Sequence, residues 1–180
     1  AMCERQRRKG VYASQYLTPD HTARQMAALA MRYFDNDSRI VDACCGTGQL
    51  TRALLLEGVH PSAILGFDAD AELVDLYERL YPDAAALRMQ FREIDFHCEN
   101  VIANPPFEVP ECTVFLQWLS RIQCSGDRAV LLLPSGFIDK QRPRSVQETM
   151  RHFIVHHRIP MQEPFARTNC RAEIVMLERV

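Results

Sequence analysis

The fold is decided by residues 41–50, which read VDACCGTGQL. The apolar run around their start, Arg39–Ala43, is typical of a buried strand, and Gln49–Glu57 is typical of a helix. Two glycines, Gly46 and Gly48, allow a sharp turn between these elements and a close approach of a ligand to the backbone. The stretch therefore predicts a strand, a ligand-binding turn and a helix at the start of an α/β fold.

Short apolar runs and longer amphipathic runs alternate on both sides of this turn. Alternation of this kind predicts an α/β fold, with a mostly parallel seven-stranded sheet and helices on both faces; the family resemblance described below implies that this fold is Rossmann-like. A first helix is expected with Thr18 as its cap and Pro19 at its first position. The other expected strands are Ser62–Phe67, Leu87–Phe91, Asn100–Ala103, Arg128–Leu133, Ile154–Ile159 and Glu173–Leu177, and the other helices are Asp70–Tyr81, Cys112–Ile122 and Ser145–His152.

The overall composition is that of a soluble globular domain. The 180 residues, of which 47% are hydrophobic, can form one domain with a full core. No apolar run is long enough for a membrane span, and Ala1–Lys9 lacks the apolar region of a secretory signal, so a cytoplasmic location is expected. Seven cysteines, with no C-x-x-C pair, indicate reduced thiols. The histidines at 97, 152, 156 and 157 match no zinc pattern, so no metal site is expected.

Charge is unevenly distributed although the net charge is only −2. The segment 57–111 carries twelve acidic residues and three arginines, whereas 140–171 carries seven basic residues and two acidic ones. A basic end could contact nucleic-acid phosphates, or it could be an ordinary solvated surface.

Two acids beside the glycine turn indicate which ligand it binds. Asp68 follows the second expected strand, where a carboxylate can accept hydrogen bonds from the ribose hydroxyls of an adenosine. Asp42 precedes the turn and would repel a pyrophosphate but attract an ammonium group. The turn also lacks the third glycine of the dinucleotide fingerprint. An adenosine with a cationic amino-acid tail, S-adenosylmethionine (SAM), fits best; a plain glycine-rich turn is the alternative.

A second turn, Asn104-Pro105-Pro106-Phe107, follows the expected strand Asn100–Ala103. The prolines fix the backbone and remove two N–H donors. The carbonyls of Pro105 and of the Asn104 side chain can then accept both hydrogens of an NH₂ group, while Phe107 offers a face on which a base can stack. This arrangement favours methyl transfer to an exocyclic amine. The alternative is a structural Pro-Pro turn.

These motifs resemble those of the amino-methyltransferase branch of class I SAM-dependent methyltransferases, which includes the N6-adenine DNA methyltransferases. Asp42–Leu50 resembles the D-x-x-x-G-x-G motif of the family, and Asn104–Phe107 its N-P-P-[YF] motif. Ser14–Pro19 resembles a Q-[YF]-x-T-P segment of restriction–modification adenine methyltransferases, and Asp95-Phe96 matches the adenine-reading position more loosely. The resemblance implies catalytic roles for Asn104, Pro105, Pro106 and Phe107, and cofactor contacts from Tyr16, Thr18, Pro19, Asp42, Ala43, Cys44, Gly46, Gly48, Leu50, Asp68, Ala69, Asp95, Phe96 and Asn104.

The resemblance implies methylation of adenine N6 in DNA, on a flipped base or a single strand. RNA bases, protein glutamine and a non-catalytic SAM-binding subunit are the alternatives. We expect a polar arm at 1–14 and a methyltransferase domain at 15–180, with no target-recognition domain. The chain would then be a minimal enzyme, a subunit that needs a separate specificity partner, or part of a longer protein.

Overall fold

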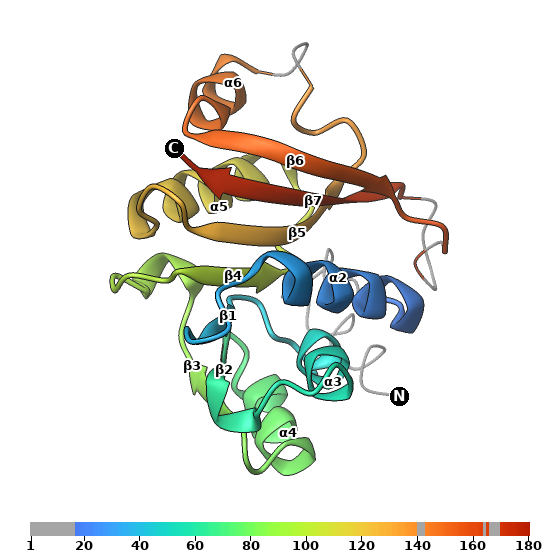
Figure 1. The fold of residues 1–180 in the computed structure, drawn as a ribbon. Helices are drawn as coiled ribbons and strands as arrows, with labels where there is room; N and C mark the ends of the chain where they lie inside the picture. The colour runs from blue at the N-terminus through green and yellow to red at the C-terminus, as the bar shows by residue number, and fades with distance from the viewer. Residues whose placement is uncertain (1–16, 140–142, 164, 166–169) are drawn as a thin grey trace.

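The computed structural model describes residues 17–139, 143–163, 165 and 170–180, and its strands form one seven-stranded sheet. The strands lie in the order β3-β2-β1-β4-β5-β7-β6 (Figure 1), and β7 alone runs opposite to the other six. This confirms the predicted fold class. The strands are β1 (Ile40–Asp42), β2 (Ile64–Asp68), β3 (Ala85–Arg88), β4 (Asn100–Ala103), β5 (Arg128–Pro134), β6 (Phe153–Pro160) and β7 (Ala172–Arg179).

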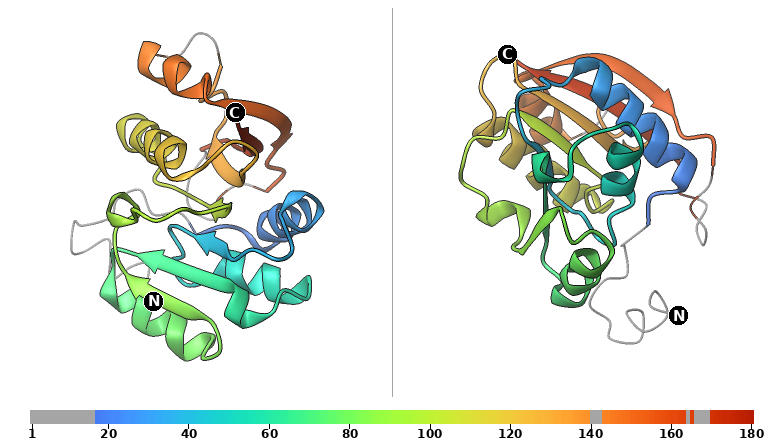
Figure 2. Two further views of the ribbon diagram at one scale, coloured as in Figure 1. Left: turned by 60° about the vertical axis from the view of Figure 1, so that its left-hand side comes forward. Right: turned by 60° about the horizontal axis from the view of Figure 1, so that its bottom comes forward.

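Helices cover both faces of the sheet. In Figure 2, α2 and α3 lie on one side of it, and α5 and α6 lie on the other. None of the helices that the structure describes has the length and hydrophobicity needed to cross a bilayer. The helices are α2 (Asp20–Tyr33), α3 (Gln49–Leu56), α4 (Ala71–Leu80), α5 (Val109–Ile122) and α6 (Arg144–Met150), with 3₁₀ turns η1 (Pro61–Ala63) and η2 (Phe91–Glu93).

The central strands are mostly apolar because both of their faces are buried. Along β5, Leu131 and Leu133 pack in the cluster that contains α5, whereas Val130 and Leu132 pack in the cluster that contains α2 and α3. Successive side chains of a strand point to opposite faces, so one apolar run supplies two cores.

The sheet has a switch point between β1 and β4. The chain moves outward from β1 to β2 and β3, then returns to β4 on the other side of β1. Asp42 pairs with Ile102, so the two strands end almost level. Ligands of such sheets bind in the crevice beyond the carboxyl ends at this point. The glycine turn follows β1 and the Asn-Pro-Pro-Phe turn follows β4, so both lie there.

Most predicted elements begin or end within one to three residues of the observed bounds, and two of the differences bear on the site. The third strand is Ala85–Arg88 rather than Leu87–Phe91, because Phe91 packs edge-on against Phe115 and Trp118 from η2 instead of extending the strand. The first helix begins at Asp20, with Pro19 in the cap position and no side-chain capping bond. Thr18 is therefore not the cap, and its hydroxyl has another partner, described below.

Candidate functional site

A cavity of about 280 Å³ opens at the carboxyl edge of the sheet. Its walls come from the segment before α2 and from the chain just after each of the first four strands. Parallel strands deliver these separate segments to one edge. The lining residues are Leu17, Thr18, Ala43, Cys44, Cys45, Gly46, Gln49, Leu50, Asp68, Ala69, Leu73, Met89, Gln90, Phe91, Arg92, Asn104, Pro105, Pro106 and Glu111.

The two glycines of the first turn have different roles. Gly46 has a φ of 53° and lines the cavity, and its N–H donates to Asp68 Oδ2 at 2.9 Å. Gly48 has a φ of 81° and does not line the cavity. A Cβ at Gly48 would lie 2.3 Å from the Tyr81 ring. Gly48 thus lets α3 begin close against the end of α4, while Gly46 shapes the wall of the cavity.

Asp42 is a fully buried carboxyl group at the end of β1, one residue before the part of the turn that lines the cavity. Among the described residues, neither of its side-chain oxygens accepts a hydrogen bond of good geometry, although the Cys44 backbone amide lies close to the carboxyl group. Burial and then the nearby Asp68 carboxylate raise the pKa of Asp42 to about 8, and the Cys44 backbone amide only partly offsets them. An unpartnered buried carboxyl is costly, and a cationic group in the cavity would reduce that cost.

Asp68 ends β2 with a carboxylate held by the backbone. Oδ2 accepts from the Gly46 N–H at 2.9 Å, and Oδ1 accepts from the Asp70 N–H at 2.9 Å. Burial raises the pKa of Asp68, and the N–H groups of Asp70 and Gly46 partly offset this increase. Each carboxylate oxygen can accept more than one hydrogen bond, so Asp68 is oriented yet able to accept two hydroxyl groups.

The second turn places Asn104, Pro105 and Pro106 on the cavity wall. Asn104 Nδ2 donates to the hydroxyl of Thr18 at 3.1 Å, which joins the segment before α2 to the end of β4. Because the NH₂ end of the amide faces Thr18, Oδ1 is the acceptor that Asn104 would contribute to a ligand. The same contact explains why Thr18 does not cap α2.

Phe107 does not line the cavity. It is 9% exposed, and its ring packs at 78° to that of Phe165 with centroids 5.2 Å apart. Ile102 and Leu132 belong to the same apolar cluster. Stacking of a base on Phe107 therefore stays a prediction, and it would require the ring to be uncovered.

The loop after β3 supplies a part of the wall that the sequence did not indicate. Met89, Gln90, Phe91 and Arg92 line the cavity, and the Arg92 guanidinium lies 5.5 Å from the centre of the Phe91 ring and pairs with Glu111. Motif matching had no signal for these residues. A predicted third strand that ended at Arg88 would have indicated them, because the residues just after it, from Met89 on, then lie at the carboxyl edge of the sheet.

Asp95 and Phe96, the predicted adenine contacts, do not reach the cavity. Both are exposed, and Phe96 packs against Phe67 and lines a second, smaller hollow with Arg39 and His97. The loop from β3 to β4 must cross from the carboxyl edge of the sheet to the amino edge. Only its first residues can face the cavity, so an adenine contact from Asp95 or Phe96 stays a prediction that this arrangement does not favour.

Most of the remaining predicted cofactor contacts line the cavity, and one does not. Ala43, Cys44, Leu50 and Ala69 line the cavity, whereas Pro19 does not. Tyr16, like the whole proposed arm 1–14, lies outside the described residues.

Thiol chemistry at the turn is disfavoured. Burial, followed by Asp68 and Asp42, raises the pKa of Cys44 well above its ordinary value, and burial raises that of Cys45 too. Both side chains are free thiols. They act as small side chains in a crowded turn.

Comparison with known proteins identifies the fold. No model of a protein family matches the sequence, and no curated protein does. Several solved structures do match. A candidate RNA methyltransferase from Pyrococcus horikoshii has a TM-score of 0.72 at 20% identity, over 94% of this chain and 89% of that one.

Two further structures share the fold. The modification subunit of a candidate type I restriction enzyme from Vibrio vulnificus has a TM-score of 0.72 at 19% identity, over 99% of this chain. This chain covers 47% of that subunit, or about half its length. Magnesium protoporphyrin IX methyltransferase from Synechocystis, solved with bound SAM, has a TM-score of 0.70 at 13% identity, over 89% and 79% of the two chains. The chain therefore has the Rossmann-like fold of the SAM-dependent methyltransferases.

Proposed function

We propose that this protein transfers a methyl group from SAM to an exocyclic amino nitrogen, with N6 of adenine in DNA as the preferred target. One observation carries the proposal: the glycine turn, Asp68 and the Asn-Pro-Pro turn line one cavity. The fold by itself does not select a substrate, because the matching structures include methyltransferases named for RNA and for a porphyrin. The choice of substrate therefore rests on the residues of the cavity.

The residues around the cavity fit SAM. The buried, unpartnered carboxyl of Asp42 suits a ligand that carries positive charge, and Asp68 suits a ribose with two hydroxyls. Leu73, Met89 and Phe91 give an apolar wall beside Asp68 on which a flat adenine can lie. We assign the cofactor to the space bounded by Thr18, the glycine turn, Asp68 and the loop after β3.

Asn104 and Pro105 would orient the target amine. Asn104 Oδ1 and the Pro105 carbonyl would accept its two hydrogens, and the two prolines fix the backbone that carries this carbonyl. This arrangement favours a pyramidal nitrogen whose lone pair points into the cavity, and the carbonyl dipoles stabilise the positive charge that develops on it. SAM would supply the methyl group on a positively charged sulfur, so no side-chain base is needed for the transfer.

Two observations favour a nucleic acid as the substrate, and the first of them favours DNA. The fold matches the modification subunit of a candidate type I restriction enzyme over 99% of this chain. The segment 140–171 is rich in arginine. Within it, Arg158 is held by Glu173 and Asp139 and therefore has a structural role, whereas Arg151 is exposed and could contact phosphate. RNA is the second candidate, because the Pyrococcus protein is named for RNA methylation.

The test is transfer of label from methyl-labelled SAM to duplex DNA, single-stranded DNA, RNA and protein in parallel reactions. We expect N6-methyladenine in DNA, and Asn104→Ala serves as the inactive control with the same cofactor affinity. Label in RNA or in protein glutamine would show that the substrate is that alternative rather than DNA. Tight SAM binding with no transfer to any of the four would indicate a non-catalytic subunit.

A further inference from the structure

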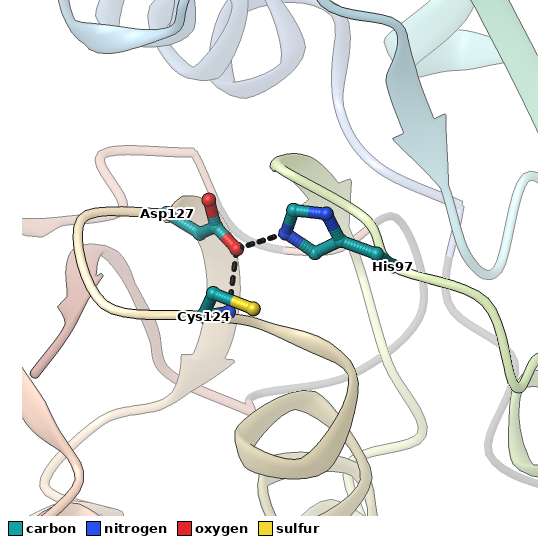
Figure 3. Close-up of side chains that lie close together, drawn as sticks. All are labelled: His97, Cys124 and Asp127. Carbon is teal, nitrogen blue, oxygen red and sulfur yellow. Dashed lines mark hydrogen bonds and ion pairs between the residues drawn. The ribbon is translucent and has the colours of Figure 1, made fainter.

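The edge of the sheet opposite the cavity carries a cluster of metal-ligating side chains. His97, Cys124 and Asp127 each offer one ligand atom, and these atoms lie within 4.8 Å of one another (Figure 3). No other group of three His, Cys, Asp or Glu residues in the described part of the chain meets the same criterion. His97 precedes β4, and the other two lie between α5 and β5. Because β4 and β5 are parallel neighbours, their entry loops meet at the amino edge.

The backbone beneath this cluster is already fixed. The buried Gln123 side chain donates from Nε2 to the carbonyls of Arg128 at 3.0 Å and Cys98 at 3.3 Å, which ties the two loops together. The Asp127 N–H donates to the Cys124 carbonyl at 3.1 Å, which closes the turn between them. A ligand set on a rigid frame loses little entropy when an ion binds.

The side chains themselves are connected and accessible. His97 Nε2 lies 2.5 Å from Asp127 Oδ2, and the Cys124 N–H donates to the same oxygen at 2.6 Å. The His97 side chain is 45% exposed and that of Asp127 is 12% exposed. An ion can therefore reach the cluster from solvent, and the Cys124 N–H would orient the carboxylate as an outer hydrogen bond does in known metal sites.

The donor set selects the metal. An imidazole nitrogen, a thiolate and a carboxylate suit Zn²⁺, whereas Mg²⁺ and Ca²⁺ prefer oxygen ligands alone. Bond lengths of about 2.0–2.3 Å in a tetrahedron place ligand atoms roughly 3.3–3.8 Å apart. The His97–Asp127 separation of 2.5 Å is below that range and no separation exceeds 4.8 Å, so side-chain movements of about 1 Å would form the site.

We propose that His97, Cys124 and Asp127 form a Zn²⁺ site that clamps the entry loops of β4 and β5, with water as the fourth ligand. Binding would release the Cys124 thiol proton to solvent, because the thiolate is the ligand. No zinc pattern is visible in the sequence because His97 and Cys124 are 27 positions apart, with helix α5 between them. The alternative is a plain His97–Asp127 ion pair, which does not require the Cys124 sulfur.

The test is calorimetric titration of the untagged full chain with ZnCl₂, and with MgCl₂ as the hard-cation control. We expect one Zn²⁺ per chain, and at least about 100-fold weaker binding in Cys124→Ser and in His97→Ala. Cys170→Ser is the matched control, because Cys170 is a partly exposed cysteine outside the cluster, and it should bind Zn²⁺ normally.

Thermal unfolding separates loss of a ligand from loss of the fold. Each variant should unfold cooperatively in EDTA at a temperature close to that of the wild type, and only the wild type and Cys170→Ser should gain stability from Zn²⁺. Absence of Zn²⁺ binding by the wild type overturns the proposal. So does binding that Cys124→Ser and His97→Ala leave unchanged, and binding of Mg²⁺ with equal affinity.

Discussion

The buried carboxyl of Asp42 should make the stability of the ligand-free protein fall as pH rises. Its pKa is raised from 3.8 to about 8, chiefly by burial. Between these values the folded protein holds a proton that the unfolded chain has lost. The free energy of unfolding should therefore decrease by about 1.4 kcal/mol per pH unit, or about 4 kcal/mol from pH 5 to pH 8.

Asp42→Asn is the perturbation that isolates this effect. Asparagine has nearly the same shape and does not ionise, so the variant lacks this contribution to the pH dependence. Urea unfolding at several pH values between 5 and 8 gives the free energy of unfolding of both proteins, and the titrating groups that do not interact with Asp42 cancel in the difference. The free energy of unfolding of Asp42→Asn should increase relative to that of the wild type as pH rises. A difference that stays constant over this range would refute a buried, neutral Asp42.

The remaining predictions concern the turns and the Thr18–Asn104 contact. Asn104→Ala should bind SAM normally and lose about 10²–10³ in turnover, as measured by label transfer, and unchanged turnover would remove Asn104 from the mechanism. Thr18→Val should lower turnover by roughly 2- to 10-fold, since one hydrogen bond to Asn104 is lost, whereas Thr18→Ser should not; equal rates for both variants would contradict this positioning role. Gly48→Ala should lower the free energy of unfolding, measured in urea, by more than the about 1–2 kcal/mol that left-handed strain costs, because the new Cβ also meets Tyr81. Gly58→Ala, with a φ of 91° and open space around the new Cβ, should show the cost of the strain alone. Equal losses for the two glycines would remove Tyr81 from the explanation.

Most of the fold could be predicted from the sequence because its central strands are short, apolar and followed by recognisable turns. The strand Asn100–Ala103 was predicted with the observed bounds, and β1 and β5 were placed within a residue at each end. The third strand was not, because it lies at the edge of the sheet and has little apolar character: Ala85 and Leu87 are exposed and only Ala86 is buried. The predicted strand was extended to Phe91 because an aromatic residue is typical of a strand, but Phe91 is buried by packing on α5.

The site could be predicted where a motif follows a strand directly. Ala43, Cys44, Gly46, Asp68, Asn104 and Pro105 were all placed in one region from sequence, and all line one cavity. What the sequence could not supply depends on the path of loops in space. Asp95 and Phe96 are only a few residues beyond Arg92, yet the chain has turned away from the cavity by then. The Thr18–Asn104 hydrogen bond and the His97–Cys124–Asp127 cluster also join residues that no local pattern connects.

The most direct test of the central claim is calorimetric titration of the purified protein with SAM and with S-adenosylhomocysteine. The cavity at the switch point predicts one site for each ligand, with binding weakened at least about 10-fold in Asp68→Ala, because both ribose hydroxyls lose their acceptor. Absence of heat from either ligand, or binding that Asp68→Ala leaves unchanged, would contradict the assignment of this cavity to SAM.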